Sequence, residues 1–183
     1  MESKLFTPVT FGPLTLRNRT IRSAAFESMC PGNAPSDMLL NYHRSVAAGG
    51  IGMTTVAYAA VTRSGLSFDR QLWMRPEIIP GLRRLTDAVH AEGAAAGIQL
   101  GHCGNMSHKS ICGCTPVGAS GGFNLYSPTF VRGLRADELP ELARAYGRSV
   151  NLAREAGFDA VEIHAGHGYL ISQFLSPATN HRK

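Results

Sequence analysis

The amino-acid sequence predicts an α/β protein whose central sheet is parallel. Short segments of apolar or small residues alternate with longer segments of helical periodicity, which is the pattern of repeated strand–helix units. A glycine also precedes the next strand in Ala-Gly-Gly at 48–50, Ala-Glu-Gly at 91–93 and Glu-Ala-Gly at 155–157. A left-handed residue is favoured where a helix ends, so these glycines indicate three helix ends. Such units build either an open, doubly wound sheet or a closed barrel of eight strands, and periodicity does not choose between them.

The first element is expected to be a small hairpin at residues 5–19, because Pro8, Gly12 and Pro13 separate its short apolar pieces. Four strands of the parallel sheet are then expected at residues 20–25, 51–56, 94–100 and 158–164. A closed barrel needs eight strands, so we expect that this chain would supply only about half of one.

Two helices are expected to present one apolar stripe each. The segment 75–92 places Leu82, Leu85 and Val89 at i, i+3 and i+7. The segment 137–156 has a similar stripe, made of Leu139, Leu142, Tyr146, Val150 and Ala153. Proline and acidic residues open both segments, where a missing N–H is harmless and negative charge is favoured.

The composition excludes several classes of protein. Of the 183 residues, 44% are hydrophobic and 17% are charged, which is an ordinary globular composition able to form a core. The net charge of +5 is spread along the chain without a basic run, so we expect small anionic ligands rather than nucleic acid. No run of 18 apolar residues occurs, so no membrane-spanning helix is expected.

The cysteines predict a reduced protein. Cys30, Cys103, Cys112 and Cys114 lack the regular spacing of a secreted disulfide framework, and Met1 is followed by charged residues rather than an apolar leader. We therefore expect a cytoplasmic protein.

Glycines at 49, 50 and 52 invite comparison with a dinucleotide-binding fingerprint. They precede a predicted strand, whereas that fingerprint follows a strand and opens a helix, so a Rossmann site is disfavoured. A metal cluster is disfavoured as well. Three cysteines at 103, 112 and 114 accompany His102 and His108 in a glycine-rich segment, but the spacing of the last two fits no paired-cysteine zinc pattern. We expect an ordinary long loop over residues 102–132 that shapes a pocket.

The segment His164-Ala-Gly-His167-Gly-Tyr169 is the strongest candidate for a functional site. It follows the fourth predicted strand, and ligand-binding residues of parallel sheets gather at the carboxyl ends of strands. Two imidazoles can donate hydrogen bonds to a developing oxyanion, and a phenol can supply a proton. The alternatives are a structural role in the turn and a zinc site, although the Glu of the helical His-Glu-x-x-His motif is missing. Gln99, near the end of the third strand, could bind the edge of an amide or imide, or bind loop backbone instead.

Several motifs then identify a family. They are Leu5-Phe6-Thr7-Pro8, Leu16-Arg17-Asn18-Arg19, Tyr42, Gly49-Gly50-Ile51-Gly52, Gln99-Leu100-Gly101-His102-Cys103-Gly104, Val161-Glu162-Ile163-His164 and His167-Gly168-Tyr169-Leu170-Ile171 running into Gln173-Phe174-Leu175-Ser176-Pro177 and Asn180-His181-Arg182. With these motifs the whole chain resembles the old yellow enzyme family of FMN-dependent ene-reductases and dienoyl reductases. The resemblance implies a (β/α)8 TIM barrel, of which residues 1–183 would be the N-terminal half of a single FMN-binding domain.

The resemblance also implies roles for residues. His164 and His167 would bind the carbonyl oxygen of an α,β-unsaturated substrate, and Tyr169 would protonate its α-carbon. FMN would pass hydride from NADH or NADPH to the β-carbon. The cofactor-binding residues would be Ser23, Ala24, Ala25, Phe26, Tyr58 and Gln99, with Gln99 at the pyrimidine edge of the flavin. Four residues depart from the common family pattern, namely Ala24, Phe26, Tyr58 and Asn105.

Three hypotheses for function follow. The first is an FMN-dependent reductase whose other half is supplied by a longer transcript or a second polypeptide, so that the partner would be a complementing C-terminal half; a homo-oligomer is the other partner considered. The second is a truncated, non-catalytic half-barrel that does not bind FMN on its own. The third is a metal-dependent hydrolase using His102, Cys103, His164 and His167.

Overall fold

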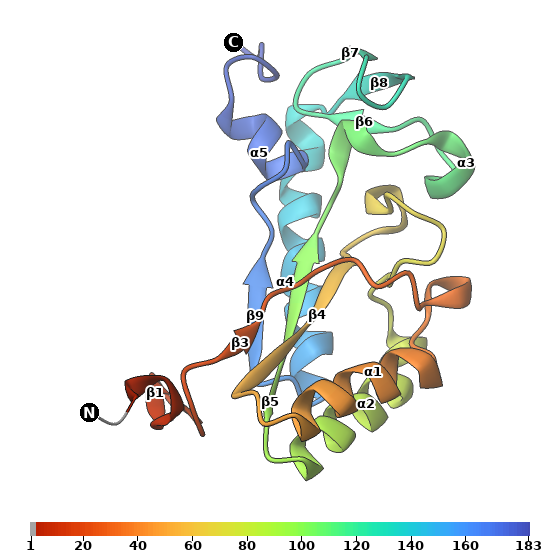
Figure 1. The fold of residues 1–183 in the computed structure, drawn as a ribbon. Coiled ribbons are helices and arrows are strands. Elements are labelled where there is room, and N and C mark those ends of the chain that lie inside the picture. The colour runs from red at the N-terminus through yellow and green to blue at the C-terminus, as the bar shows by residue number, and fades with distance from the viewer. Residues whose placement is uncertain (1–2) are drawn as a thin grey trace.

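The computed structural model describes residues 3–183 and contains a four-stranded parallel sheet. Its strands, in spatial order, are β3 (Ile21–Arg22), β4 (Met53–Ala60), β5 (Ala95–Gly101) and β9 (Ala160–Ile163). Three helices connect them: α1 (Asp37–Ala48), α2 (Ile79–Ala91) and α4 (Leu139–Glu155). Figure 1 shows α4 running behind the sheet and the pair α1 and α2 packed side by side. The predicted parallel sheet and its four strands are confirmed.

One hydrophobic core joins the sheet to these helices. Leu82, Leu85 and Val89 of α2 are fully buried, which confirms the predicted stripe. Ile98 and Leu100 of β5 belong to the same core. Because side chains alternate between the two faces of a strand, Gln99 points to the opposite face, which is the inner face of a barrel.

The N-terminal hairpin is confirmed as β1 (Val9–Phe11) and β2 (Leu14–Leu16), which pair in antiparallel fashion. It lies at the end of the sheet where the parallel strands begin (Figure 1). Arg17, directly after it, donates hydrogen bonds to three backbone carbonyls: Ala47 at 2.6 Å, Glu92 at 2.7 Å and Ile51 at 3.0 Å. One guanidinium thereby joins the ends of α1 and α2 to the segment just before β4.

Several predicted boundaries differ from the structure. The first parallel strand is shorter than residues 20–25, because the chain turns away from β4 after Arg22. Helices α2 and α4 are each preceded by a 3-10 turn, at Pro76–Ile78 and Ala136–Glu138. Val150 was expected in the apolar stripe of α4 but is exposed, and the buried face of that helix carries the smaller Ala145, Ser149 and Ala153.

The segment 102–132 is not the plain loop that was expected. It contains the short helix α3 (Lys109–Cys112) and the strands β6 (Val117–Gly118), β7 (Gly122–Asn124) and β8 (Thr129–Gly133), which form a three-stranded sheet in the order β6-β8-β7. Strands β6 and β7 have only two and three residues, which is too short to show a periodicity of two. Together with α5 (Leu170–Leu175) they lie at the carboxyl end of the parallel strands (Figure 1).

The four parallel strands and their covering helices form a partial barrel. Strands β3 and β9 are the two edges of the described sheet. In the part of the chain that the structure describes, no helix is both long and apolar enough to cross a membrane.

Candidate active site

The three predicted catalytic side chains lie together just beyond the carboxyl end of β9. His164 follows the strand and is buried, and its backbone N–H donates to the carbonyl of Leu100 at 2.8 Å. His167 Nδ1 lies 3.1 Å from His164 Nε2, within hydrogen-bond distance. The ring of Tyr169 packs edge-on to that of His164, with the centroids 5.1 Å apart. Two imidazoles and one phenol therefore form a single cluster, as the spacing predicted.

The local backbone explains this arrangement. His167 has a left-handed φ of 56° and Gly168 has 68°, so the chain reverses direction between the second imidazole and the phenol. The N–H of Leu170 donates to the carbonyl of His102 at 2.9 Å, which fixes the start of α5 against the end of β5. Tyr169 is the residue just before that helix.

Burial sets the protonation of the cluster. It lowers the pKa of His164, and the neighbouring His167 lowers that pKa further. Burial raises the pKa of the Tyr169 phenol. At neutral pH the first imidazole is therefore neutral and the phenol retains its proton, so both groups can donate a hydrogen bond.

Tyr58 joins this cluster from β4. Its ring lies 5.5 Å from that of Tyr169 and 6.0 Å from that of His164, measured between centroids. Its hydroxyl donates to the carbonyl of Gly65. A Cβ placed on Gly101 would lie 2.5 Å from the Tyr58 ring, so glycine at 101 is what allows this bulky residue to pack against β5.

Gln99 lies on the inner face of the sheet, where its amide donates to Glu162 Oε1 at 2.7 Å. The two residues face each other across β5 and β9. Glu162 was not among the sequence candidates, although it is the acidic residue of a strand whose other face is apolar. The carboxylate orients the Gln99 amide, leaving the carbonyl oxygen of that amide as an acceptor.

The segment Ser23–Phe26 follows β3 and has no strand partner. None of its backbone N–H groups donates to another backbone group among the described residues. Glu27, which sequence reasoning missed, anchors the segment: its carboxylate accepts from Arg22 at 2.9 Å and from the N–H of Ala57 at 3.2 Å. Phe26 is about half exposed and stacks on Phe68 at 4.6 Å between centroids.

Gln173 of α5 also positions parts of the site, although the sequence analysis assigned it no role. Its fully buried amide donates to Gly168 O at 2.7 Å and to Asn105 Oδ1 at 2.9 Å, and its oxygen accepts from the N–H of Asn105 at 3.2 Å. It therefore ties the turn between His167 and Tyr169 to the segment after β5.

His102 and Cys103, considered as metal ligands above, are engaged in other contacts. The ring of His102 accepts from the N–H of Gly104 at 3.0 Å and contacts Ser64 Oγ at 3.1 Å. The thiol of Cys103 contacts the carbonyl of Leu66 at 3.3 Å. Within residues 3–183, no group of three or more His, Cys, Asp or Glu side chains is arranged to hold a metal ion.

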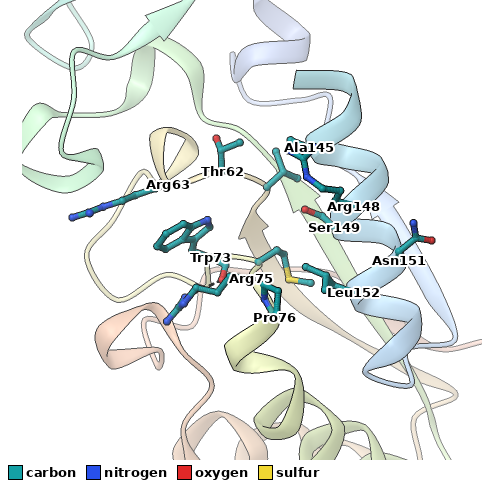
Figure 2. Close-up of a pocket in the computed structure, with 12 residues that line it drawn as sticks. Thr62, Arg63, Trp73, Arg75, Pro76, Ala145, Arg148, Ser149, Asn151 and Leu152 are labelled. Carbon is teal, nitrogen blue, oxygen red and sulfur yellow. Dashed lines mark hydrogen bonds between the residues drawn. The ribbon is translucent and has the colours of Figure 1, made fainter. Parts of the chain in front are cut away.

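A cleft of about 510 Å³ opens beside His167 and is lined by the β7–β8 hairpin, including Phe123, Leu125 and Tyr126. A separate cleft of about 460 Å³ lies between α4 and the residues that connect β4 to α2, and Figure 2 shows Trp73 and Arg148 on its walls. None of the predicted site residues lines that second cleft. The cleft beside His167 is therefore the one of these two that contacts a predicted catalytic residue.

Known proteins share both the fold and the sequence motifs of this chain. The parallel sheet and its covering helices form part of the TIM-barrel fold of the old yellow enzymes. The chain belongs to the NADH:flavin oxidoreductase / NADH oxidase family, whose model matches residues 4–183.

The similarity to individual proteins supports membership of this family. The chain is 44% identical over 178 residues to the 4,4'-dithiodibutanoate disulfide reductase of Rhodococcus erythropolis, covering 97% of this chain and 44% of that protein. It is 38% identical over 186 residues to the NADPH dehydrogenase of Listeria monocytogenes serotype 4a (strain HCC23), covering 99% of this chain and 54% of that one. The old yellow enzyme homologue from Zymomonas mobilis superimposes with a TM-score of 0.90 at 29% identity, over 98% of this chain and 53% of the other. The chain thus spans about half the length of these relatives.

The family implies FMN, and the residues present fit such a group. Free backbone donors at Ser23–Phe26, the amide of Gln99 and the exposed ring of Phe26 offer polar contacts for a heterocycle and an apolar surface beside it.

Proposed function

We propose that residues 1–183 are the N-terminal half of an FMN-binding barrel domain, and that the whole protein reduces the activated C=C bond of an α,β-unsaturated carbonyl compound. Bound FMN would supply hydride taken from NAD(P)H. The observation that carries the proposal is the cluster of His164, His167 and Tyr169 at the carboxyl end of β9. Family membership supports the flavin and nicotinamide cofactors.

The two imidazoles would bind the substrate carbonyl. In the structure they lie within hydrogen-bond distance of each other, so their polar atoms are partly satisfied by one another. A carbonyl oxygen placed between them would accept a hydrogen bond from each ring instead. The neutral state of His164 favours this role, because a hydrogen-bond donor polarises the carbonyl without requiring a buried charge.

Tyr169 would deliver the proton to the α-carbon. The raised pKa keeps its phenol protonated at neutral pH, and its ring lies beside His164, where the substrate carbonyl would bind. Gln99 and the backbone of Ser23–Phe26 would hold the flavin, and Tyr58 would pack beside it.

The test is a comparison of half-reactions in the whole protein. Replacing Tyr169 with Phe should slow the reduction of a cyclic enone by at least about tenfold, since general acid catalysis contributes roughly 10²–10⁴-fold, while flavin reduction by NAD(P)H stays nearly unchanged. Stopped-flow absorbance at the flavin band measures both steps. Tyr42→Phe, the same chemical change on α1, is the control and should leave both rates as in the wild type. Equal loss in both half-reactions would contradict the role of proton donor.

Replacing His164 and His167 together with Ala should weaken the binding of a phenol to the oxidised protein, because the phenolate oxygen would lose both donors. Each lost hydrogen bond to a charged group is worth about 1.5–3 kcal/mol, so a loss of affinity of at least tenfold is expected. Titration of the long-wavelength charge-transfer absorbance measures it. Unchanged affinity would show that the oxygen binds elsewhere.

A second candidate acceptor is an organic disulfide carrying carboxylates. It is favoured by the 44% identity to the disulfide reductase of Rhodococcus erythropolis. Steady-state oxidation of NADPH with 4,4'-dithiodibutanoate and with a cyclic enone, at matched concentrations, separates the two. A larger kcat/KM for the disulfide would make the C=C bond the minor substrate.

A further inference from the structure

Two of the four cysteines form a close pair outside the candidate active site. Cys112 is the last residue of α3 and Cys114 follows it after a single glycine, and their Sγ atoms lie 3.8 Å apart. Gly113 between them has a left-handed φ of 77°, which turns the chain so that both side chains lie on the same side. A disulfide bond has a length of about 2.05 Å, so the sulfurs need to approach by less than about 2 Å to bond.

The two thiols differ in accessibility. Cys112 is buried and its Sγ lies 3.1 Å from the carbonyl of Cys114, whereas Cys114 is exposed. An exposed thiol beside a buried one is the arrangement of an attacking and a resolving cysteine. Cys30 and Cys103 are buried and have no other cysteine within bonding reach among the described contacts, so this pair is distinct.

Cys114 lines an open cleft with charged residues of both signs. The cleft has a volume of about 520 Å³, and its lining includes Arg132, which is paired with Glu138 at 2.7 Å. The guanidinium of Arg63 lies 3.5 Å from the position of a Cβ built on Gly113. Burial and Cys112 raise the pKa of the Cys114 thiol, while Arg132 and Arg63 act in the opposite direction. Exchange at neutral pH is therefore expected to be slower than at a cysteine whose pKa is lowered.

The pair also lies away from the open edges of the sheet. It belongs to the connection between β5 and α4 and packs near Arg63, which follows β4. Strands β4 and β5 are the inner strands of the described sheet, so the pair lies away from its two edges.

We propose that Cys112 and Cys114 form a redox-active dithiol that reduces low-molecular-weight disulfides and is itself oxidised to a disulfide. The thiolate of Cys114 attacks one sulfur of R–S–S–R, whose S–S bond breaks and releases one R–S⁻. The thiolate of Cys112 then attacks Cys114 Sγ, which breaks the mixed disulfide and releases the second R–S⁻. The two cysteine protons end on the two released thiols, so one external disulfide is reduced for each internal disulfide formed.

The test uses oxidised glutathione as the probe and the whole protein without NAD(P)H, so its outcome does not depend on the proposed flavin reaction. After reduction and removal of the reductant, the native protein is incubated in glutathione buffers of increasing oxidised fraction, quenched with an alkylating reagent and mapped by peptide mass. The wild type should lose both free thiols of the Cys112–Cys114 peptide together, with a mass decrease of two hydrogen atoms.

Variants separate the two roles. Cys112→Ser should accumulate a glutathione adduct on Cys114, because no resolving thiol remains, whereas Cys114→Ser should leave the buried Cys112 unmodified. Cys30→Ser is the matched control and should behave as the wild type. The proposal is overturned if the wild-type peptide stays fully reduced in oxidised glutathione, or if it carries a stable glutathione adduct instead of the internal disulfide. Both outcomes are read on the wild type, so they hold even if a variant fails to fold.

Discussion

His102 shows how a residue beside the candidate site affects the stability of the fold. It is fully buried, and burial lowers its pKa to about 4 from an ordinary value of 6.5. The neutral ring accepts from the N–H of Gly104, which leaves the other nitrogen to donate to Ser64. A protonated ring could no longer accept that bond.

This shift predicts a loss of stability in acid. Between pH 6.5 and about 4 the unfolded chain binds a proton that the folded chain does not, so the free energy of unfolding falls as the pH falls through this range. The full loss from this group is about 3 kcal/mol. Urea unfolding monitored by circular dichroism at several pH values measures the slope of the free energy of unfolding against pH.

His102→Asn should flatten that slope, because the Asn oxygen can still accept from Gly104 but does not titrate. A smaller slope should remain, since the pKa of His164 is lowered as well. The same substitution at the exposed His181 is the control and should leave the slope unchanged. A slope that His102→Asn does not alter would show that other groups control the acid sensitivity.

At the scale of elements, the ends of helices depend on one side chain. Arg17 donates to carbonyls from the ends of α1 and α2 and from the residue that leads into β4. The last carbonyls of a helix have no partner within it, so a guanidinium with several donors is well suited to this position. The motif Leu16-Arg17-Asn18-Arg19 therefore has a structural role at the end of the sheet opposite the candidate site.

Arg17→Ala should lower the free energy of unfolding by about 2–4 kcal/mol, because three partly buried carbonyls lose a charged donor. Arg19→Ala is the matched control. Its side chain is exposed and makes one long contact, with Thr7 Oγ1 at 3.4 Å, so a change within about 0.5 kcal/mol is expected. The midpoint of denaturant unfolding measures both effects, provided that the dependence of the unfolding free energy on denaturant concentration stays unchanged. An equal shift of the midpoint in the two variants would mean that the three contacts of Arg17 add no stability.

At the scale of the whole molecule, the sheet has two unpaired edges. Strands β3 and β9 have no outer neighbour among the described residues, and Ile21 and Ile163 on them are 45% and 46% exposed. Parallel strands are usually buried on both faces, and exposed edges favour association. On the inner face, Gln99 is buried but Glu162 is exposed.

We therefore expect the isolated 183-residue chain to associate and to bind FMN weakly or not at all. Gel filtration after incubation with FMN measures both, through the elution volume and the flavin absorbance of the protein peak. A longer chain that includes the proposed C-terminal half of the barrel is the control and should elute with flavin. A monomeric chain that retains nearly equimolar FMN would show that residues 1–183 hold the cofactor by themselves, and would contradict a half-barrel that does not bind FMN on its own.

Much of this fold could be predicted because it depends on neighbours along the chain. Leu82, Leu85 and Val89 repeat at helical spacing, and Gly93 and Gly157 adopt the left-handed φ that the ends of the helices require. The cluster of His164, His167 and Tyr169 could be predicted for the same reason, since one turn after one strand holds all three. The short strands of the segment 102–132 could not, because their pairing depends on chain reversals rather than on a repeating pattern.

The sequence by itself determined the alternation of strands and helices, the hairpin, the strand-end cluster and, through its motifs, the family. Only the tertiary structure decided the partners of individual side chains: Tyr58 against Tyr169, Gln99 with Glu162, and Glu27 with the N–H of Ala57. Periodicity is set by residues a few positions apart and can be read along one chain. A contact between distant segments depends on how the strands and helices cross in space, and no local pattern contains that information.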